Sequence, residues 1–315
     1  ETGEIVAEYL HGRDSYGSVF DPSGETFFSF GYDNDVYQWD LETGEHILTL
    51  RGHTASIYDI DFTEDGKNAL TASQDGSIRL WNLETGAEIS RFMGHTDYVY
   101  DVMYLPDEQQ FISTSFDSTL RLWDLHTDEM IAQLEGHEAT VYQVRFNDDG
   151  TRLLSSSRDG TARMWDIATD ETIQIFKADD PETEEIEGNV GWVMAADFSP
   201  DGTQVVTSTY DGYMLLWDAE TGELIRVFGP DDPETDTIEG HAPTTDPNDP
   251  MATWNVSFAP DGKHAFTSSF DETIIQWDLE TGEVVRQYIG HTHGVLGITF
   301  VDDDGGRFIS HSWDN

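Results

Sequence analysis

One phrase recurs six times in this chain and constrains its fold more than any other feature. It reads YQWDLETGE, RLWNLETGA, RLWDLHTDE, RMWDIATDE, LLWDAETGE and IQWDLETGE. Its tryptophans are Trp39, Trp81, Trp123, Trp165, Trp217 and Trp277, separated by 42, 42, 42, 52 and 60 residues. A recurring unit of this length is typical of a repeat architecture, in which neighbouring units share one hydrophobic core.

Each repeat predicts four short β-strands. In the second repeat, SIYDIDF alternates in polarity and ends at the turn TEDG; KNALTAS, the turn QDG and SIRLWNL follow, and ETG leads into EISRF. Alternating segments separated by glycine-containing turns favour hairpins over helices. The first turn recurs as DPSG, TEDG, NDDG, SPDG and APDG, which predicts a glycine with positive φ at its end.

Three features recur together: a Gly-His dipeptide, a Ser/Thr-x-Asp turn, and Trp-Asp six residues after the turn aspartate. On these features the chain resembles the WD-repeat β-propeller family over essentially its whole length. The resemblance implies an all-β, seven-bladed β-propeller of four-stranded antiparallel blades. We expect one such domain over residues 1–315, with acidic insertions between blades at about 177–191 and 229–253.

The last repeat has a turn aspartate without a signature tryptophan. SHSWD aligns with STSFD and TSSFD, so Asp314 is the seventh turn aspartate and Trp313 occupies the variable position before it. The spacing predicts that this blade lacks one strand, with roughly seven residues missing between Asn315 and another ETGE. The N-terminal EIVAEYL is expected to close the blade. Either the sequence is part of a longer chain, or another chain supplies the strand.

The resemblance implies a hydrogen-bonded network of His, Ser/Thr, Asp and Trp inside each blade. The matching residues in blades two, three and four are His53, Ser73, Asp75, Trp81, His95, Ser115, Asp117, Trp123, His137, Ser157, Asp159 and Trp165. A Ser-His-Asp trio also occurs in hydrolases, but its repetition favours a structural role. Walker, GxSxG and HExxH motifs are absent from the sequence, so we expect no enzyme and no catalytic residue.

Three repeats depart from that pattern. Asn189 stands where a histidine is expected in the fifth repeat, and Gly31 replaces the Ser/Thr of the first. In the sixth, the long insertion that follows His241 makes a structural role for that histidine doubtful.

Aromatic residues recur at two further positions. The residue before each turn aspartate is Tyr32, Gln74, Phe116, Arg158, Tyr210, Phe270 or Trp313, and an early residue of each first strand is Tyr16, Tyr58, Tyr100, Tyr142, Met194, Trp254 or Leu296. The resemblance places both positions on one partner-facing side. Aromatic rings there would offer rigid contact area to a protein partner and would attract its Lys or Arg side chains. In the alternative interpretation the rings pack on one another and complete the core.

The chain is strongly acidic. Asp and Glu number 63 against 15 Lys and Arg, giving a formal net charge of −48, and cysteine is absent. Such a surface repels nucleic-acid phosphates and anionic lipids, so we expect no nucleic acid and no membrane insertion, but a partner with basic groups. The acidity predicts an extracellular or cell-surface protein, or alternatively one in the cytoplasm of a salt-adapted organism.

The two insertions carry near-duplicate acidic text, ADDPETEEIEG and PDDPETDTIEG. Their clustered carboxylates are Asp179, Asp180, Glu182, Asp231, Asp232 and Glu234. Proline predicts loops here, and these loops are candidates for partner contact. Oxygen ligands suit calcium, but the EF-hand spacing is absent, so calcium stays open and no other cofactor or metal is expected.

These observations favour a non-catalytic protein–protein interaction platform. One alternative is a structural subunit of a cell-surface or extracellular assembly, self-assembled through the open seventh blade. Another is a sensor segment of a larger bacterial signalling protein. A fold alone does not decide among these functions.

Overall fold

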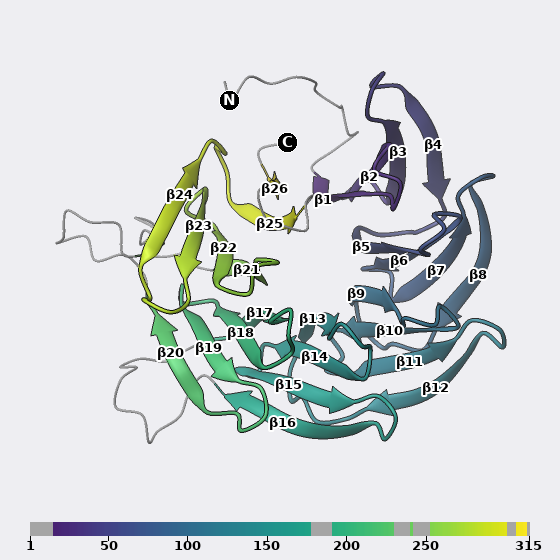
Figure 1. Ribbon diagram of the computed structural model, residues 1–315. Helices are drawn as coiled ribbons and strands as arrows, with labels where there is room; N and C mark the ends of the chain where they lie inside the picture. The colour runs from purple at the N-terminus through teal and green to yellow at the C-terminus, as the bar shows by residue number, and fades with distance from the viewer. Residues whose placement is uncertain (1–14, 178–190, 230–239, 242–252, 301–306, 314–315) are drawn as a thin grey trace. The chain divides into compact units, whose positions relative to one another are not determined.

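The structure is a computed structural model that describes residues 15–177, 191–229, 240–241, 253–300 and 307–313 (Figure 1). All regular elements in these ranges are β-strands, arranged in six four-stranded antiparallel sheets and one two-stranded sheet. Each sheet uses consecutive strands in chain order, which confirms the predicted fold class and the four-strand repeat. The chain divides into two compact units; the expectation of a single domain stays a prediction.

The first unit, Glu1–Asp117 with Arg121–Gln133, contains the first three sheets apart from Leu120 and Leu134. Their strands are β1 Ser15–Phe20, β2 Thr26–Gly31, β3 Asp35–Asp40, β4 His46–Arg51, β5 Ile57–Phe62, β6 Asn68–Ser73, β7 Ser77–Asn82, β8 Ala87–Met93, β9 Val99–Tyr104, β10 Gln110–Ser115, β11 Leu120–Asp124 and β12 Glu129–Leu134.

The second unit, Leu134–Asp314 with Ser118–Leu120, contains the remaining sheets. Their strands are β13 Val141–Phe146, β14 Arg152–Ser157, β15 Thr161–Asp166, β16 Glu171–Lys177, β17 Val193–Phe198, β18 Gln204–Thr209, β19 Met214–Asp218, β20 Leu224–Phe228, β21 Thr253–Phe258, β22 His264–Ser269, β23 Thr273–Asp278, β24 Val284–Ile289, β25 Val295–Phe300 and β26 Phe308–Ser312. The last two form the two-stranded sheet. The expected closing strand EIVAEYL and the terminal Asn315 lie outside the described residues.

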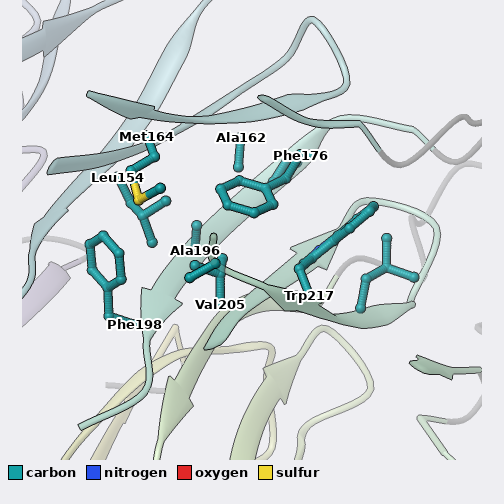
Figure 2. Packing of buried hydrophobic residues seen from close by; sticks show 11 residues of the cluster. Leu154, Ala162, Met164, Phe176, Ala196, Phe198, Val205 and Trp217 are labelled. Atoms are coloured by element: carbon teal, nitrogen blue, oxygen red, sulfur yellow. The ribbon is translucent and has the colours of Figure 1, made fainter. Parts of the chain in front are cut away.

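The core lies between successive sheets. The second strand of every four-stranded sheet is buried at five of its six positions, whereas no fourth strand has more than one buried position. In the second unit, Phe176 and Met164 of one sheet pack against Ala196, Val205 and Trp217 of the next (Figure 2). Within each unit, sheets that are neighbours in sequence therefore bury faces against one another, as a repeat protein requires.

The five first turns for which a glycine was predicted have the expected geometry, at Gly24, Gly66, Gly150, Gly202 and Gly262. Gly66 has φ +65° and Gly202 has φ +69°, in the left-handed region that favours glycine. The third repeat lacks this glycine, and Glu108 adopts φ +51° there instead.

The fourth strand contains one extra residue beside the signature tryptophan. In the second repeat, Trp81 pairs with Glu88 and Leu80 pairs with Ser90, so Ile89 has no partner of its own. The same register shift occurs where β3, β15, β19 and β23 pair with their fourth strands. The extra residues there are Ile47, Ile173, Ile225 and Val285, all exposed. A bulge of this kind increases the local twist of a strand.

Candidate functional site

A hydrogen-bonded network in the second repeat joins β6 and β7 to the loop before β5 and to the β6–β7 turn. His53 Nδ1 lies 3.0 Å from an Asp75 carboxylate oxygen, and His53 Nε2 lies 2.7 Å from the Thr71 hydroxyl. Trp81 donates its indole N–H to the same hydroxyl over 2.8 Å. Because a carboxylate only accepts, Nδ1 donates to Asp75; the Thr71 hydroxyl then donates to Nε2 and accepts from Trp81.

Burial fixes the charge state of this network. It lowers the pKa of His53, so the imidazole is neutral near pH 7. Burial alone would raise the pKa of Asp75, but the hydrogen bonds from His53 and Ser77 hold it well below its ordinary value. The network is therefore a neutral histidine on a charged carboxylate, with the histidine side chain fully buried.

The third and fourth repeats contain the same arrangement. His95 bridges Asp117 and Ser113, and Trp123 donates to Ser113. In the fourth repeat the corresponding residues are His137, Asp159, Ser155 and Trp165.

The serine assigned to the network from the sequence is in the wrong place. Ser73 does not contact His53 or Trp81; its hydroxyl donates to the Ser56 carbonyl and accepts the Asp75 backbone N–H. In the fourth repeat Ser157 likewise caps its turn, and in the third Ser115 accepts the Asp117 N–H. The hydroxyl that joins the network belongs to the residue two positions earlier in the strand. Residues i and i+2 share one face of a strand, so both hydroxyls lie on the same side of the sheet.

A pattern in the sequence identifies the hydroxyls that were missed. A Ser or Thr stands four residues before the turn aspartate in all seven repeats: Ser29, Thr71, Ser113, Ser155, Thr207, Thr267 and Ser310. The position assigned from the family pattern, by contrast, holds Gly31 in the first repeat.

The sixth repeat makes the network despite its insertion. His241 Nδ1 lies 3.0 Å from Asp271, and its Nε2 lies 2.8 Å from Thr267, which accepts the Trp277 N–H. The doubt about His241 was therefore wrong. The first and fifth repeats keep the indole bond, to Ser29 and Thr207 respectively. Asn189 lies outside the described residues.

Four aromatic rings form one cluster in the first unit. Tyr58 stacks on Tyr100 with ring centroids 5.0 Å apart, and Phe116 lies 5.5 Å from Tyr100. Tyr98, which sequence reasoning missed, lies 5.3 Å from Phe116 and is exposed. These residues are called the tyrosine cluster below. Tyr32 is exposed, whereas the side chain of Tyr16 lies outside the described residues.

A second aromatic group lies in the second unit. The Arg158 guanidinium lies 4.2 Å from the centroid of the Trp192 ring, and Trp192 lies 4.5 Å from Tyr210. Trp192 was also missed, because it immediately precedes β17 and is not in either aligned position. Tyr142 is a correction: only 9% of it is exposed, so it packs into the core and offers little contact area.

A third group consists of Trp254, Phe270 and Trp313. Phe270 lies 5.2 Å from Trp254 and 5.0 Å from Trp313, with steep interplanar angles. Trp254 Nε1 is buried, and no hydrogen-bond partner for it occurs among the described residues. The rings of this group pack on one another, as the alternative interpretation expected, while each of the three residues stays partly exposed.

Carboxylates on the first strands join neighbouring sheets, which the sequence did not indicate. Asp59 of β5 accepts the Val102 N–H of β9 over 3.0 Å, and Asp61 accepts the Tyr104 N–H over 2.7 Å. Burial and the nearby Asp101 carboxyl raise the pKa of Asp59 well above its ordinary value. In the second unit, Asp197 accepts the Phe258 N–H over 2.9 Å, and burial raises its pKa to about 6.

The acidic residues of both insertions fall outside the described parts of the chain, so the structure says nothing about them. Asp179, Asp180, Glu182, Asp231, Asp232 and Glu234 all lie outside the described residues, so the calcium question stays open. Within the described ranges, no helix has the length and apolar character needed to span a membrane.

Comparison with known proteins identifies the repeat. The family model described as WD domain, G-beta repeat matches residues 44–82, 86–124, 128–166, 181–218 and 234–278. Pre-mRNA-processing factor 17 of Homo sapiens is 33% identical over 120 residues, which is 37% of this chain and 17% of that protein. A guanine nucleotide-binding protein subunit beta of Zea mays is 31% identical over 137 residues, 42% of this chain and 32% of that protein. The chain thus spans about a third or less of the relatives it matches.

These relatives correct the expected location and settle the family. Pre-mRNA processing takes place inside cells, so such relatives contradict the extracellular expectation; acidity gives solubility in any compartment. They give no support to an extracellular assembly or a bacterial sensor. The repeat model matches five segments that together make up more than half of the chain. The chain belongs to the WD-repeat family, and its seven sheets correspond to the blades of a seven-bladed β-propeller.

Proposed function

We propose that this chain is a non-catalytic platform for protein–protein interaction and that its aromatic groups make the contact. The tyrosine cluster carries the proposal. Tyr58, Tyr98, Tyr100 and Phe116 gather in one place from two adjacent blades, and Tyr98 is 37% exposed.

Aromatic rings held by one another suit this role. A Tyr ring has few rotatable bonds, so little conformational entropy is lost when a partner immobilises it. Buried aromatic anchors also contribute most of the binding energy in many interfaces. The four rings of the tyrosine cluster lie 5.0–6.4 Å from their neighbours and are thereby ordered before a partner arrives.

The charge of the chain supports a basic partner. A formal net charge of −48 attracts cationic proteins over long range and speeds their association at low salt. Cations can also rest on the faces of Tyr and Phe rings.

The experiment selects binders from a displayed peptide library on the immobilised protein and measures their affinity for two variants. The test variant carries Tyr98→Ser and Phe116→Ser. The control carries Ile47→Ser and Ile89→Ser, which removes aliphatic side chains exposed to 49% and 51% on the fourth strands.

We expect the test variant to lose about tenfold or more in affinity, corresponding to ~1.4 kcal/mol, and the control to stay close to the parent. Melting temperatures of both variants verify folding. Equal losses in the two variants, or binding that survives the test substitutions, would refute the proposal.

A further inference from the structure

Arg158 stands at a position that is aromatic in five of the seven repeats. Its guanidinium lies over Trp192 at 4.2 Å from the ring centroid, and Trp192 in turn lies against Tyr210. Arg158 therefore takes the place of a ring in the second aromatic group and adds a positive charge to it.

This arginine has no carboxylate partner within the described residues, although the chain has 63 acidic side chains and only 15 Lys and Arg. Other arginines do have such partners: Arg51 pairs with Asp35, Arg79 with Glu88, and Arg121 with Asp117. Arg158 is exposed, and its guanidinium lies over the Trp192 ring.

Stacking on the ring leaves the guanidinium N–H groups of Arg158 available for hydrogen bonds. The ring covers a face of the planar guanidinium, while the N–H groups lie in the plane and point outward at its edges. That fork matches the two oxygens of a carboxylate. Because Trp192 already restrains the side chain, a ligand loses less entropy on binding than it would at a freely rotating arginine.

Tyr142, which lies near Arg158, does not neutralise the charge of the guanidinium. Burial raises the pKa of Tyr142 to about 12, and the Arg158 charge acts in the opposite direction. Tyr142 is therefore a neutral phenol at physiological pH and does not act as a phenolate counter-ion.

We infer that Arg158, stacked on Trp192, anchors one Asp or Glu carboxylate of a protein partner. The inference rests on the proposed function and adds to it the chemistry of one contact. Since the chain repels anionic partners at long range, the carboxylate belongs to a segment that is otherwise neutral or basic. The pairing then sets the position of the partner on the aromatic surface more than it adds affinity.

The test uses acetate as the probe, in the full chain labelled with ¹⁵N-arginine. The Arg158 Nε–H resonance is identified as the one that disappears in Arg158→Lys. At constant ionic strength, acetate should shift it saturably and acetamide should not. Trp192→Ala should weaken the acetate effect several-fold by freeing the side chain.

Arg286 provides the matched control, because it is also exposed and lies over a ring, Tyr288, at 5.5 Å. An equal acetate shift at Arg286 would mean ordinary ion pairing and would overturn the inference. So would the absence of a saturable shift at Arg158, or tighter binding of inorganic phosphate than of acetate at this residue.

Acetate binding needs no protein partner, so this result is independent of the peptide selection. Failure of the titration leaves the aromatic platform intact, and failure of the selection removes the platform while leaving the anion site. When both succeed, selected peptides with a Glu→Gln change should lose affinity for the parent chain but not for Arg158→Lys.

Discussion

The Ser155 hydroxyl offers the sharpest test of the blade network. It accepts the Trp165 indole N–H over 2.8 Å and lies 2.7 Å from His137 Nε2, to which it donates. Ser155→Ala removes both bonds and leaves two buried polar atoms without partners. Each such atom costs about 1–3 kcal/mol, so we expect the free energy of unfolding to fall by about 2–6 kcal/mol. Urea denaturation followed by tryptophan fluorescence measures this change.

Ser157→Ala is the matched control, since Ser157 is the residue that the family pattern assigns to the network. Ser157 is itself buried, but its hydroxyl contacts the Ala139 carbonyl at 3.2 Å and the Asp159 N–H at 3.1 Å, and these two partners are partly exposed. Water replaces such partners more easily, so we expect a loss of about 1 kcal/mol. If Ser157→Ala destabilises the chain more than Ser155→Ala, the assignment of the network hydroxyl is wrong.

Three further predictions concern stability. Trp123→Ala should lower the free energy of unfolding by about 3–5 kcal/mol, the range for a buried tryptophan, and a near-neutral result in urea denaturation would contradict the core assignment. The pKa of Asp197 is raised to about 6 from an ordinary 3.8, so the folded state keeps the proton in this interval and the free energy of unfolding falls as pH rises from 4 to 6. The free energy of unfolding of Asp197→Asn, which does not titrate, should therefore rise by up to about 3 kcal/mol relative to the parent across that interval. Parallel pH profiles of the two proteins would refute the reasoning. Gly66→Ala should lower the free energy of unfolding by about 1 kcal/mol because of the positive φ of this residue. No steric clash adds to this cost, since the nearest atom to an added Cβ is 3.8 Å away. An unchanged melting temperature would show that the turn relaxes.

The repeated phrase predicted the number of strands per repeat, the turn glycines and the buried tryptophans. These features depend on local alternation and on turn chemistry, which are legible in a single repeat. The resemblance to the WD-repeat family implied that His53, Asp75 and Trp81 belong to one network, and the structure joins them.

Contacts between repeats could not be predicted in this way. Tyr98 and Trp192 lie just outside the aligned positions, and their ring contacts depend on how one sheet packs on the next. The same holds for Asp59 and Asp197, which read as ordinary polar residues of alternating strands. Their roles come from backbone N–H groups about 43 and 61 residues away in the chain.

The extra residue found in five of the fourth strands has a consequence for association. Strand β8 ends its sheet, so its outer side presents N–H and C=O groups that another chain could pair with. A regular strand is a good template for such addition, whereas Ile89 interrupts the spacing of those groups. The same interruption recurs at Ile47, Ile173, Ile225 and Val285. At these five fourth strands, the extra residue therefore makes the outer edge a poorer template for strand addition, although its aliphatic side chain is exposed.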